Sequence, residues 1–140
     1  MKKKLIALSL ALVMCLAFVA CGDGDNSDTQ SPPDLTGTWL PDDYKTAEMY
    51  QEAIINGDTI TVNWVSTEDD TKMLYWAGTY VAPTDAGSSY SWDSTADHEQ
   101  TDLSLFASSD DTKTFTYDNG KLSYTASGFG VSKTIELKKQ

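Results

Sequence analysis

Residues 56–64, Asn-Gly-Asp-Thr-Ile-Thr-Val-Asn-Trp, carry the pattern that decides the fold class of this chain. Apolar side chains stand at Ile60, Val62 and Trp64, and Thr or Asn occupies each position between them. This period of two is typical of a half-buried β-strand. The preceding Asn56-Gly57 pair favours a tight type I′ hairpin, since both residue types tolerate positive φ. The stretch therefore predicts a strand that pairs antiparallel with the segment before it.

The same alternation recurs along the chain, and a second Asn-Gly pair stands at residues 119–120. Residues 43–53 allow either a short helix from Asp43 or a strand in their second half, and we favour the strand. Eight or nine short strands predict an all-β fold, a small antiparallel up-and-down β-barrel over residues 35–140, with a β-sandwich as the alternative. The expected strands are 35–40, 48–55, 59–66, 73–82, 89–93, 102–107, 113–118, 121–127 and 131–138.

The N-terminus has the form of an export signal over residues 1–20. Lys2 to Lys4 precede the apolar run Leu5 to Ala20, which is shorter than the roughly 20 residues that span a bilayer. Residues 18–21, Phe-Val-Ala-Cys, resemble the lipobox of bacterial lipoproteins. The resemblance implies cleavage before Cys21 and diacylglycerol on its sulfur, followed by a second acyl chain. We expect a lipid-anchored protein on the extracytoplasmic face of the cell membrane, the alternative being an ordinary secretory signal with Cys21 as a free thiol.

Residues 21–34 follow this signal and form a polar, acidic segment after the cysteine, with two prolines near its end. This composition predicts a disordered linker. Asp23, Asp25 and Asp34 match positions 1, 3 and 12 of a calcium-loop template, but Asp28 stands where the template requires Gly. The linker interpretation is therefore favoured over a calcium site.

The charge of the chain excludes nucleic acid as a partner. The sequence has 10 lysines, no arginine and 21 carboxylates, a net charge of −11. Residues 35–140 alone contain seven of the lysines and 17 of the carboxylates, a net charge of −10. Affinity for a phosphate backbone depends on Lys and Arg, so nucleic-acid binding is not expected. We expect a monomer.

The residues that catalysis would need are mostly missing. His98, the single histidine, stands in a polar stretch that predicts a solvated loop, and no Gly-x-Ser-x-Gly motif occurs. Lipidation of Cys21 would leave no thiolate for a Cys/His zinc site. The sequence therefore predicts no enzyme activity, no cofactor and no metal.

Asp-Asp-Thr-Lys occurs twice, at residues 69–72 and 110–113, each time before a strand that begins with aromatic residues. We expect equivalent hairpin loops at the two places. The alternative is that Asp69, Asp70, Asp110 and Asp111 converge on one rim and bind a cation.

A further resemblance rests on Thr36-Gly37-Thr38-Trp39. A Gly-x-Trp on the first strand resembles the lipocalin signature, which implies that Gly37 and Trp39 close one end of the barrel. Lipocalins pack an arginine across this tryptophan, and Lys133 or Lys138 on the last strand would have to replace it here. The chain also resembles small bacterial lipoproteins of unassigned role. This second similarity rests on residues 52–55, 74–79 and 112–122.

The aromatic content suggests a function. Trp64, Trp76, Tyr80 and Trp92 lie on strands whose alternation places them on one face, and they are the candidate ligand-binding residues. The alternative is that they fill the interior of a small barrel. We expect a non-catalytic binding module for a small hydrophobic or envelope-derived ligand. The competing expectation is a surface-interaction or envelope-protection protein that acts through its acidic exterior.

Overall fold

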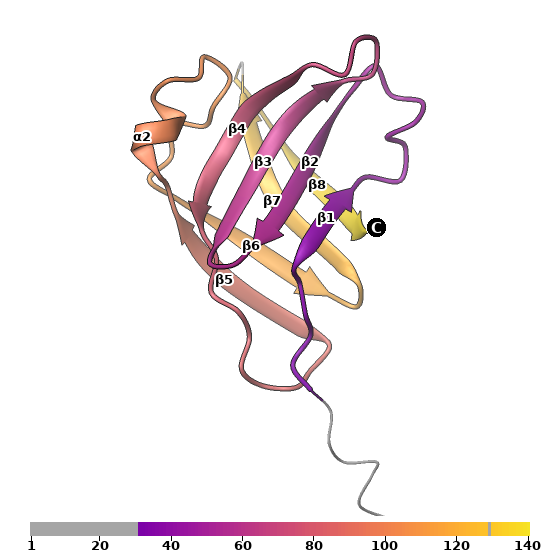
Figure 1. The fold of residues 1–140 in the computed structure, drawn as a ribbon, viewed down its shortest axis with the longest axis vertical. Helices are drawn as coiled ribbons and strands as arrows, with labels where there is room; N and C mark the ends of the chain where they lie inside the picture. Colours follow the sequence, from indigo (N-terminus) through magenta and orange to yellow (C-terminus); the bar gives the residue numbers. More distant parts are fainter. Residues whose placement is uncertain (1–30, 129) are drawn as a thin grey trace, which may run out of the picture. The chain divides into compact units, whose positions relative to one another are not determined.

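The computed structural model describes residues 31–128 and 130–140. The predicted signal peptide, Cys21 and most of the predicted linker lie outside the described residues. The described part forms eight β-strands and one short helix (Figure 1). No helix in that part is long and apolar enough to cross a membrane. The elements are β1 (Gly37–Leu40), β2 (Met49–Asn56), β3 (Thr59–Ser66), β4 (Lys72–Thr79), β5 (Ser89–Thr95), α2 (His98–Thr101), β6 (Thr112–Asp118), β7 (Lys121–Gly128) and β8 (Val131–Lys139).

The strands form one antiparallel sheet in the order β4-β3-β2-β1-β8-β7-β6-β5. Every neighbour is consecutive in the chain except β1 and β8, which pair through Trp39 with Lys139 and Leu40 with Lys138. This up-and-down order, curling into a nearly closed barrel, confirms the predicted fold class (Figure 1).

The barrel closes at the seam between β4 and β5, which meet at a single bridging pair, Gly78 and Ala96, in the described chain. The Asp97 amide donates to the Ala77 carbonyl at 2.8 Å beside this pair. Trp76 Nε1 donates to Ser94 Oγ at 3.0 Å inside the seam. Thr79 adds two contacts across the seam, since its Oγ1 accepts from the Thr95 amide at 2.9 Å and its carbonyl accepts from Trp92 Nε1 at 3.3 Å.

The segment between β5 and β6 occupies the place where β4 and β5 diverge. Ser104 Oγ donates to the Leu74 carbonyl and the Ser108 amide donates to the Tyr75 carbonyl, both at 2.8 Å. The prediction of a strand over 102–107 was wrong. Asp97 caps α2 by accepting from the Glu99 amide at 3.1 Å, and Leu105 is 97% exposed. The alternation in this segment does not mark a buried face.

Residues 43–53 divide as expected. A turn precedes β2, in which the Ala47 amide donates to the Asp43 carbonyl at 2.9 Å. The strand begins at Met49, which confirms the strand interpretation of the second half.

The two Asn-Gly pairs form different turns. Asn119 and Gly120 are the central residues of the β6–β7 hairpin and both have positive φ, 49° and 90°, as a type I′ turn requires. In the β2–β3 hairpin, Asn56 instead pairs with Thr59, so the central residues are Gly57 and Asp58. Only Gly57 has positive φ, 63°, which is the pattern of a type II′ turn. The hairpin forms as predicted, with its turn one residue further along.

A bulge in β4 sets the packing of the barrel interior. Val62 pairs with Trp76 and Asn63 pairs with Leu74, so Tyr75 is an extra residue on β4. Because of this extra residue, the side chains of two successive residues, Tyr75 and Trp76, are both buried. The bulge also places Leu74 opposite Asn63, whereas sequence alternation places it on the face of Ile60.

Candidate functional site

Trp39, which the lipocalin resemblance predicts to close one end of the barrel, lies in the core cluster. Its side chain is buried, its Nε1 donates to the Leu35 carbonyl at 2.9 Å, and its ring meets Tyr117 edge-on at 6.1 Å between centroids. Gly37 has φ of 136°, and a Cβ there would lie 3.1 Å from Lys139 Cε. The lysine beside Gly37 is therefore Lys139, which is also the register partner of Trp39. Neither Lys133 nor Lys138, the two lysines predicted to pack across Trp39, occupies this position.

The other end of the barrel holds a pocket of about 660 Å³. This volume lies within the roughly 300–1,000 Å³ of small-molecule sites. The residues of its wall come from β2, β3, β4, β7, β8 and the β5–β6 connection. They are Met49, Trp64, Met73, Tyr75, Leu105, Phe106, Ala107, Ser108, Ser109, Asp110, Ala126, Ser127, Gly128, Val131, Lys133 and Ile135.

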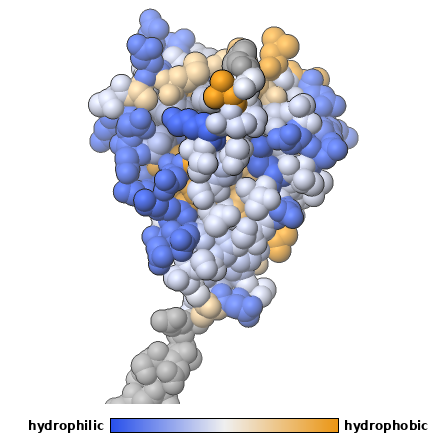
Figure 2. Space-filling view, turned by 180° about the vertical axis from the view of Figure 1, so that it is seen from behind, coloured by the Kyte–Doolittle hydropathy of each residue, from blue (hydrophilic) through white to orange (hydrophobic). Residues whose placement is uncertain are grey.

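The rim of this pocket is apolar and open to solvent. Met49 is 47% exposed and Val131 is 67% exposed, and Leu105 and Phe106 are also exposed. Figure 2 shows hydrophobic side chains gathered at the upper end of the molecule, with hydrophilic residues along its flanks. Four large apolar side chains therefore surround one opening.

The strands of the pocket wall become more buried toward the core. On β2 the pocket-facing side chain Met49 is followed two residues later by the buried Gln51. On β8 the exposed Val131 is followed by the half-buried Ile135 and the buried Leu137. Side chains two apart share a face of a strand, so these rows run from the rim into the interior.

A buried lysine, Lys113, is bonded to Asp110, which lines the pocket. The Lys113 ammonium donates to Asp110 Oδ2 at 3.1 Å and to the Thr125 carbonyl at 3.2 Å. It also lies 5.4 Å from the Tyr75 ring centre and 5.3 Å from that of Trp76, within cation–π range. The bonds from Ser108 and Lys113 hold the pKa of the Asp110 carboxyl below its usual value. This charge pair is therefore satisfied within the protein.

The four predicted ligand-binding residues separate into two places. Trp64 lines the pocket and packs edge-on against Tyr75 at 6.0 Å between ring centroids. Trp76, Tyr80 and Trp92 are buried in the core cluster. Trp92 lies 5.0 Å from Tyr80 between centroids, and Trp76 is hydrogen-bonded across the seam. Sequence alternation identified the inward face but not the depth of each residue along the barrel.

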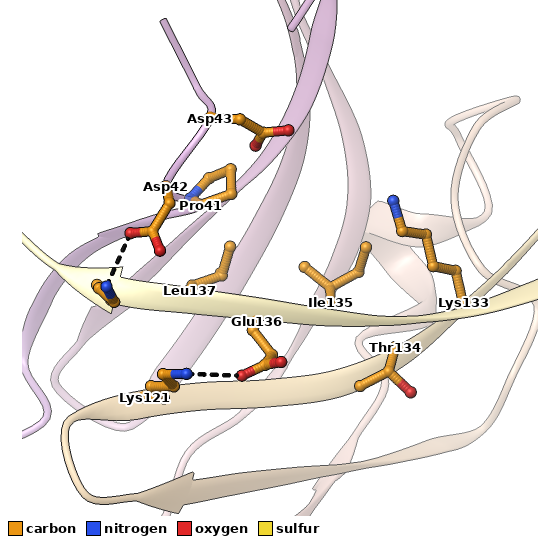
Figure 3. A pocket seen from close by; sticks show the side chains of 10 residues that line it. Pro41, Asp42, Asp43, Lys121, Lys133, Thr134, Ile135, Glu136 and Leu137 are labelled. Carbon is orange, nitrogen blue, oxygen red and sulfur yellow. Dashed lines mark ion pairs between the residues drawn. The ribbon is translucent and has the colours of Figure 1, made fainter. Parts of the chain in front are cut away.

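A second hollow of about 260 Å³ lies in the barrel wall beside β8 (Figure 3). β1 ends at Leu40, so β8 pairs with it only through Lys138 and Lys139. Lys133 and Ile135 line both this hollow and the main pocket. Figure 3 shows ion pairs on its sides, between Lys138 and Asp42 at 3.0 Å and between Lys121 and Glu136 at 3.3 Å.

His98 is not a free loop histidine. Its Nε2 lies 3.0 Å from Asp111 and its Nδ1 lies 3.3 Å from Asp102. The hydrogen bond to Asp111 is the main cause that raises the pKa of His98 above 6.5. The histidine thus links α2 to the residue just before β6.

The two acidic pairs are not equivalent loops. Asp69 and Asp70 lie in the turn between β3 and β4, where the Thr71 amide donates to Asp69 Oδ1 at 3.2 Å. Asp110 and Asp111 instead end the long connection from β5 to β6. Over residues 31–128 and 130–140, no group of three or more His, Cys, Asp or Glu side chains is arranged to hold a metal ion.

Comparison with known proteins gives no relative from which a function could be inferred, so the functional proposal rests on the fold and the pocket. The chain matches no protein-family model, no curated protein and no solved structure. The described residues define an antiparallel up-and-down barrel with a pocket whose rim is apolar.

Proposed function

We propose that this domain binds a small hydrophobic ligand in the pocket at the open end of the barrel and has no catalytic role. The observation that carries the proposal is the exposed apolar rim around a pocket of about 660 Å³. An exposed apolar rim costs solvation free energy in the empty protein, and a bound apolar molecule would recover it.

The proposal includes export and lipidation at Cys21, on the cell membrane and facing away from the cytoplasm. The lipobox-like residues 18–21 support this location. The charge of −10 on residues 35–140 is repelled by anionic lipid headgroups, so acyl chains would be needed to hold the domain at a membrane. A lipid-anchored domain would meet apolar ligands derived from the envelope.

Ligand binding can be tested with the unit Pro32–Gln140, which contains every described strand and the buried core. Native mass spectrometry of this unit, purified without detergent, should reveal a bound apolar molecule. The unit should also bind N-phenyl-1-naphthylamine with a rise in the fluorescence of the dye. If it neither retains a ligand nor binds the dye, the proposal fails.

A matched pair of variants locates the site. Met49→Lys places a charge on the pocket rim, and Val81→Lys places one on an exposed apolar position that does not line the pocket. We expect Met49→Lys to weaken dye binding and Val81→Lys to leave it unchanged. If both variants weaken dye binding equally, the dye does not bind in the pocket. A partner captured from cells and released by high salt, in the absence of dye binding, would instead favour the acidic exterior.

A further inference from the structure

The pocket wall contains a positive charge that the protein leaves without an ion pair. Among the described residues that line the pocket, Asp110 and Lys133 are the charged ones. Lys113 already neutralises Asp110, with 3.1 Å between Nζ and Oδ2. No ion pair between a lysine and a carboxylate within residues 31–128 and 130–140 involves Lys133. The wall therefore presents one uncompensated ammonium group.

Lys133 stands on the face of β8 that turns toward the barrel interior. It shares this face with the half-buried Ile135 and the buried Leu137, because side chains two apart lie on one side of a strand. Its register partner on β7 is Ala126, which is 7% exposed and also lines the pocket. Lys133 itself is exposed. A lysine in such a place lays its aliphatic stem along the apolar wall and keeps its ammonium in water at the opening.

The second hollow also presents carboxylates to this lysine. Lys133 and Asp43 both line that hollow. In Figure 3 dashed lines join the other two lysines of the hollow to Asp42 and Glu136, and none reaches Lys133 or Asp43. Asp42 and Glu136 are thus already neutralised. In the described part of the chain, Asp43 is the acidic side chain of this hollow with which a ligand would compete for Lys133.

The apolar wall and the single free cation together select a class of ligand. A cationic head group would be repelled by Lys133, and an uncharged one would gain no ion pair there. The net charge of −10 on residues 35–140 opposes an anion at long range, but at physiological salt this repulsion is largely screened beyond about 8 Å. Asp110, the acid in the wall, is already paired. An anionic head group in contact with Lys133 is therefore favoured.

We propose that the pocket takes a single-chain amphiphile with one anionic head group, a carboxylate or a phosphate, and that the Lys133 ammonium pairs with this group at the opening. This inference rests on the proposed function and adds the chemical class of the ligand. The apolar chain of the molecule lies in the pocket against Trp64 and Ile135. Its head group stays in water beside β8.

Three compounds with similar alkyl chains test this subsite. Decanoate and decyl phosphate have an anionic head group, and 1-decanol has an uncharged one. Their affinities are measured by displacement of N-phenyl-1-naphthylamine from the native chain, from Lys133→Met and from Lys45→Met. Lys45 is an exposed lysine that does not line the pocket, so the two variants change the net charge equally. The affinity for 1-decanol also reports whether each variant keeps its pocket.

We expect Lys133→Met to weaken the binding of the anions by about fivefold, since an exposed ion pair contributes up to about 1 kcal/mol. The affinity for 1-decanol should stay unchanged, and Lys45→Met should leave all three affinities as they are. The anion that loses more affinity identifies the head group. No loss for either anion, an equal loss for 1-decanol, or the same loss in Lys45→Met would overturn the subsite while ligand binding stands. If neither the compounds nor the dye binds, the proposed function fails and the subsite fails with it.

Reversing the charge gives a second, independent measurement. Lys133→Glu should bind decylammonium about fivefold more tightly than the native chain does, and this gain should shrink as salt is added. Lys133→Arg keeps the charge and should keep the native affinity for the anions. If Lys133→Glu binds 1-decanol normally but gains nothing for decylammonium, residue 133 does not contact the head group and the proposal is wrong.

Discussion

The seam between β4 and β5 makes the sharpest prediction, because it depends on a single missing side chain. Gly78 forms the bridging pair with Ala96, and its φ lies outside the left-handed region. A Cβ at this position would lie 2.4 Å from Ser94 Oγ, 2.6 Å from the Thr95 carbonyl oxygen and 2.7 Å from Trp76 Nε1. Gly78→Ala must therefore push the two strands apart.

The expected loss of stability has two parts. Overpacking a tight contact costs about 1–3 kcal/mol. Separation of Trp76 Nε1 from Ser94 Oγ removes a buried hydrogen bond of about 1 kcal/mol. Alanine lowers the entropy of the unfolded chain relative to glycine, which returns about 0.4–1 kcal/mol. The free energy of unfolding should therefore fall by about 2–3 kcal/mol.

Urea denaturation followed by tryptophan fluorescence measures this change. With a slope of about 1–3 kcal/mol per molar urea, the midpoint should fall by about 0.7–3 M. Gly87→Ala is the control, since the nearest atom to its Cβ would be 3.9 Å away. We expect this control to match or slightly exceed the native stability. If Gly78→Ala is as stable as Gly87→Ala, the seam is not tightly closed and the reasoning is refuted.

Three other outcomes follow from the anchor, the histidine and Trp39. Cys21→Ala should move the protein from the membrane fraction to the soluble fraction on cell fractionation, and continued membrane association would contradict lipidation. Hydrogen bonding to Asp111 raises the pKa of His98 above 6.5, so the protonated ring stabilises the fold fully below that pH and the effect is lost as pH rises through the raised pKa. The native chain should therefore be more stable than His98→Gln near about pH 5.5, with the two converging by about pH 9, and a pH-independent difference in denaturation would argue against this. Trp39→Phe leaves the Leu35 carbonyl without its donor and should lower the denaturation free energy by about 1–3 kcal/mol, whereas an unchanged value would exclude a closing role for this bond.

Local patterns predicted most of the strands, and they failed where the alternation did not correspond to burial. The β3 strand and the β6–β7 hairpin follow directly from Ile60, Val62, Trp64 and the Asn119-Gly120 pair. The segment 102–107 has the same alternation, yet the capping carboxylate of Asp97 starts a helical turn in front of it. A capping side chain offers the backbone hydrogen bonds that compete with those of a strand. The outcome also depends on which strand edge the segment can reach in the folded barrel.

Of the four candidate ligand-binding residues, one lines the pocket and three lie in the core. Trp64 was identified together with Trp76, Tyr80 and Trp92, since period two assigns a face and carries no information about depth. Depth depends on register, which pairs Trp64 with Gln51 near the open end. Gln51 itself had no sequence signal, because a glutamine in a strand is ordinarily exposed.

The sequence by itself determined the all-β class, the up-and-down order and the acidic charge of the domain, because all three follow from composition and from contacts between neighbours in the chain. Tertiary structure alone decided the close approach at Gly78, the bulge that leaves both Tyr75 and Trp76 buried, and the burial of the Gln51 amide. These features arise where strands distant in sequence meet. A pattern of alternating residues specifies which face is buried, and only closure of the barrel specifies which side chains face each other across it.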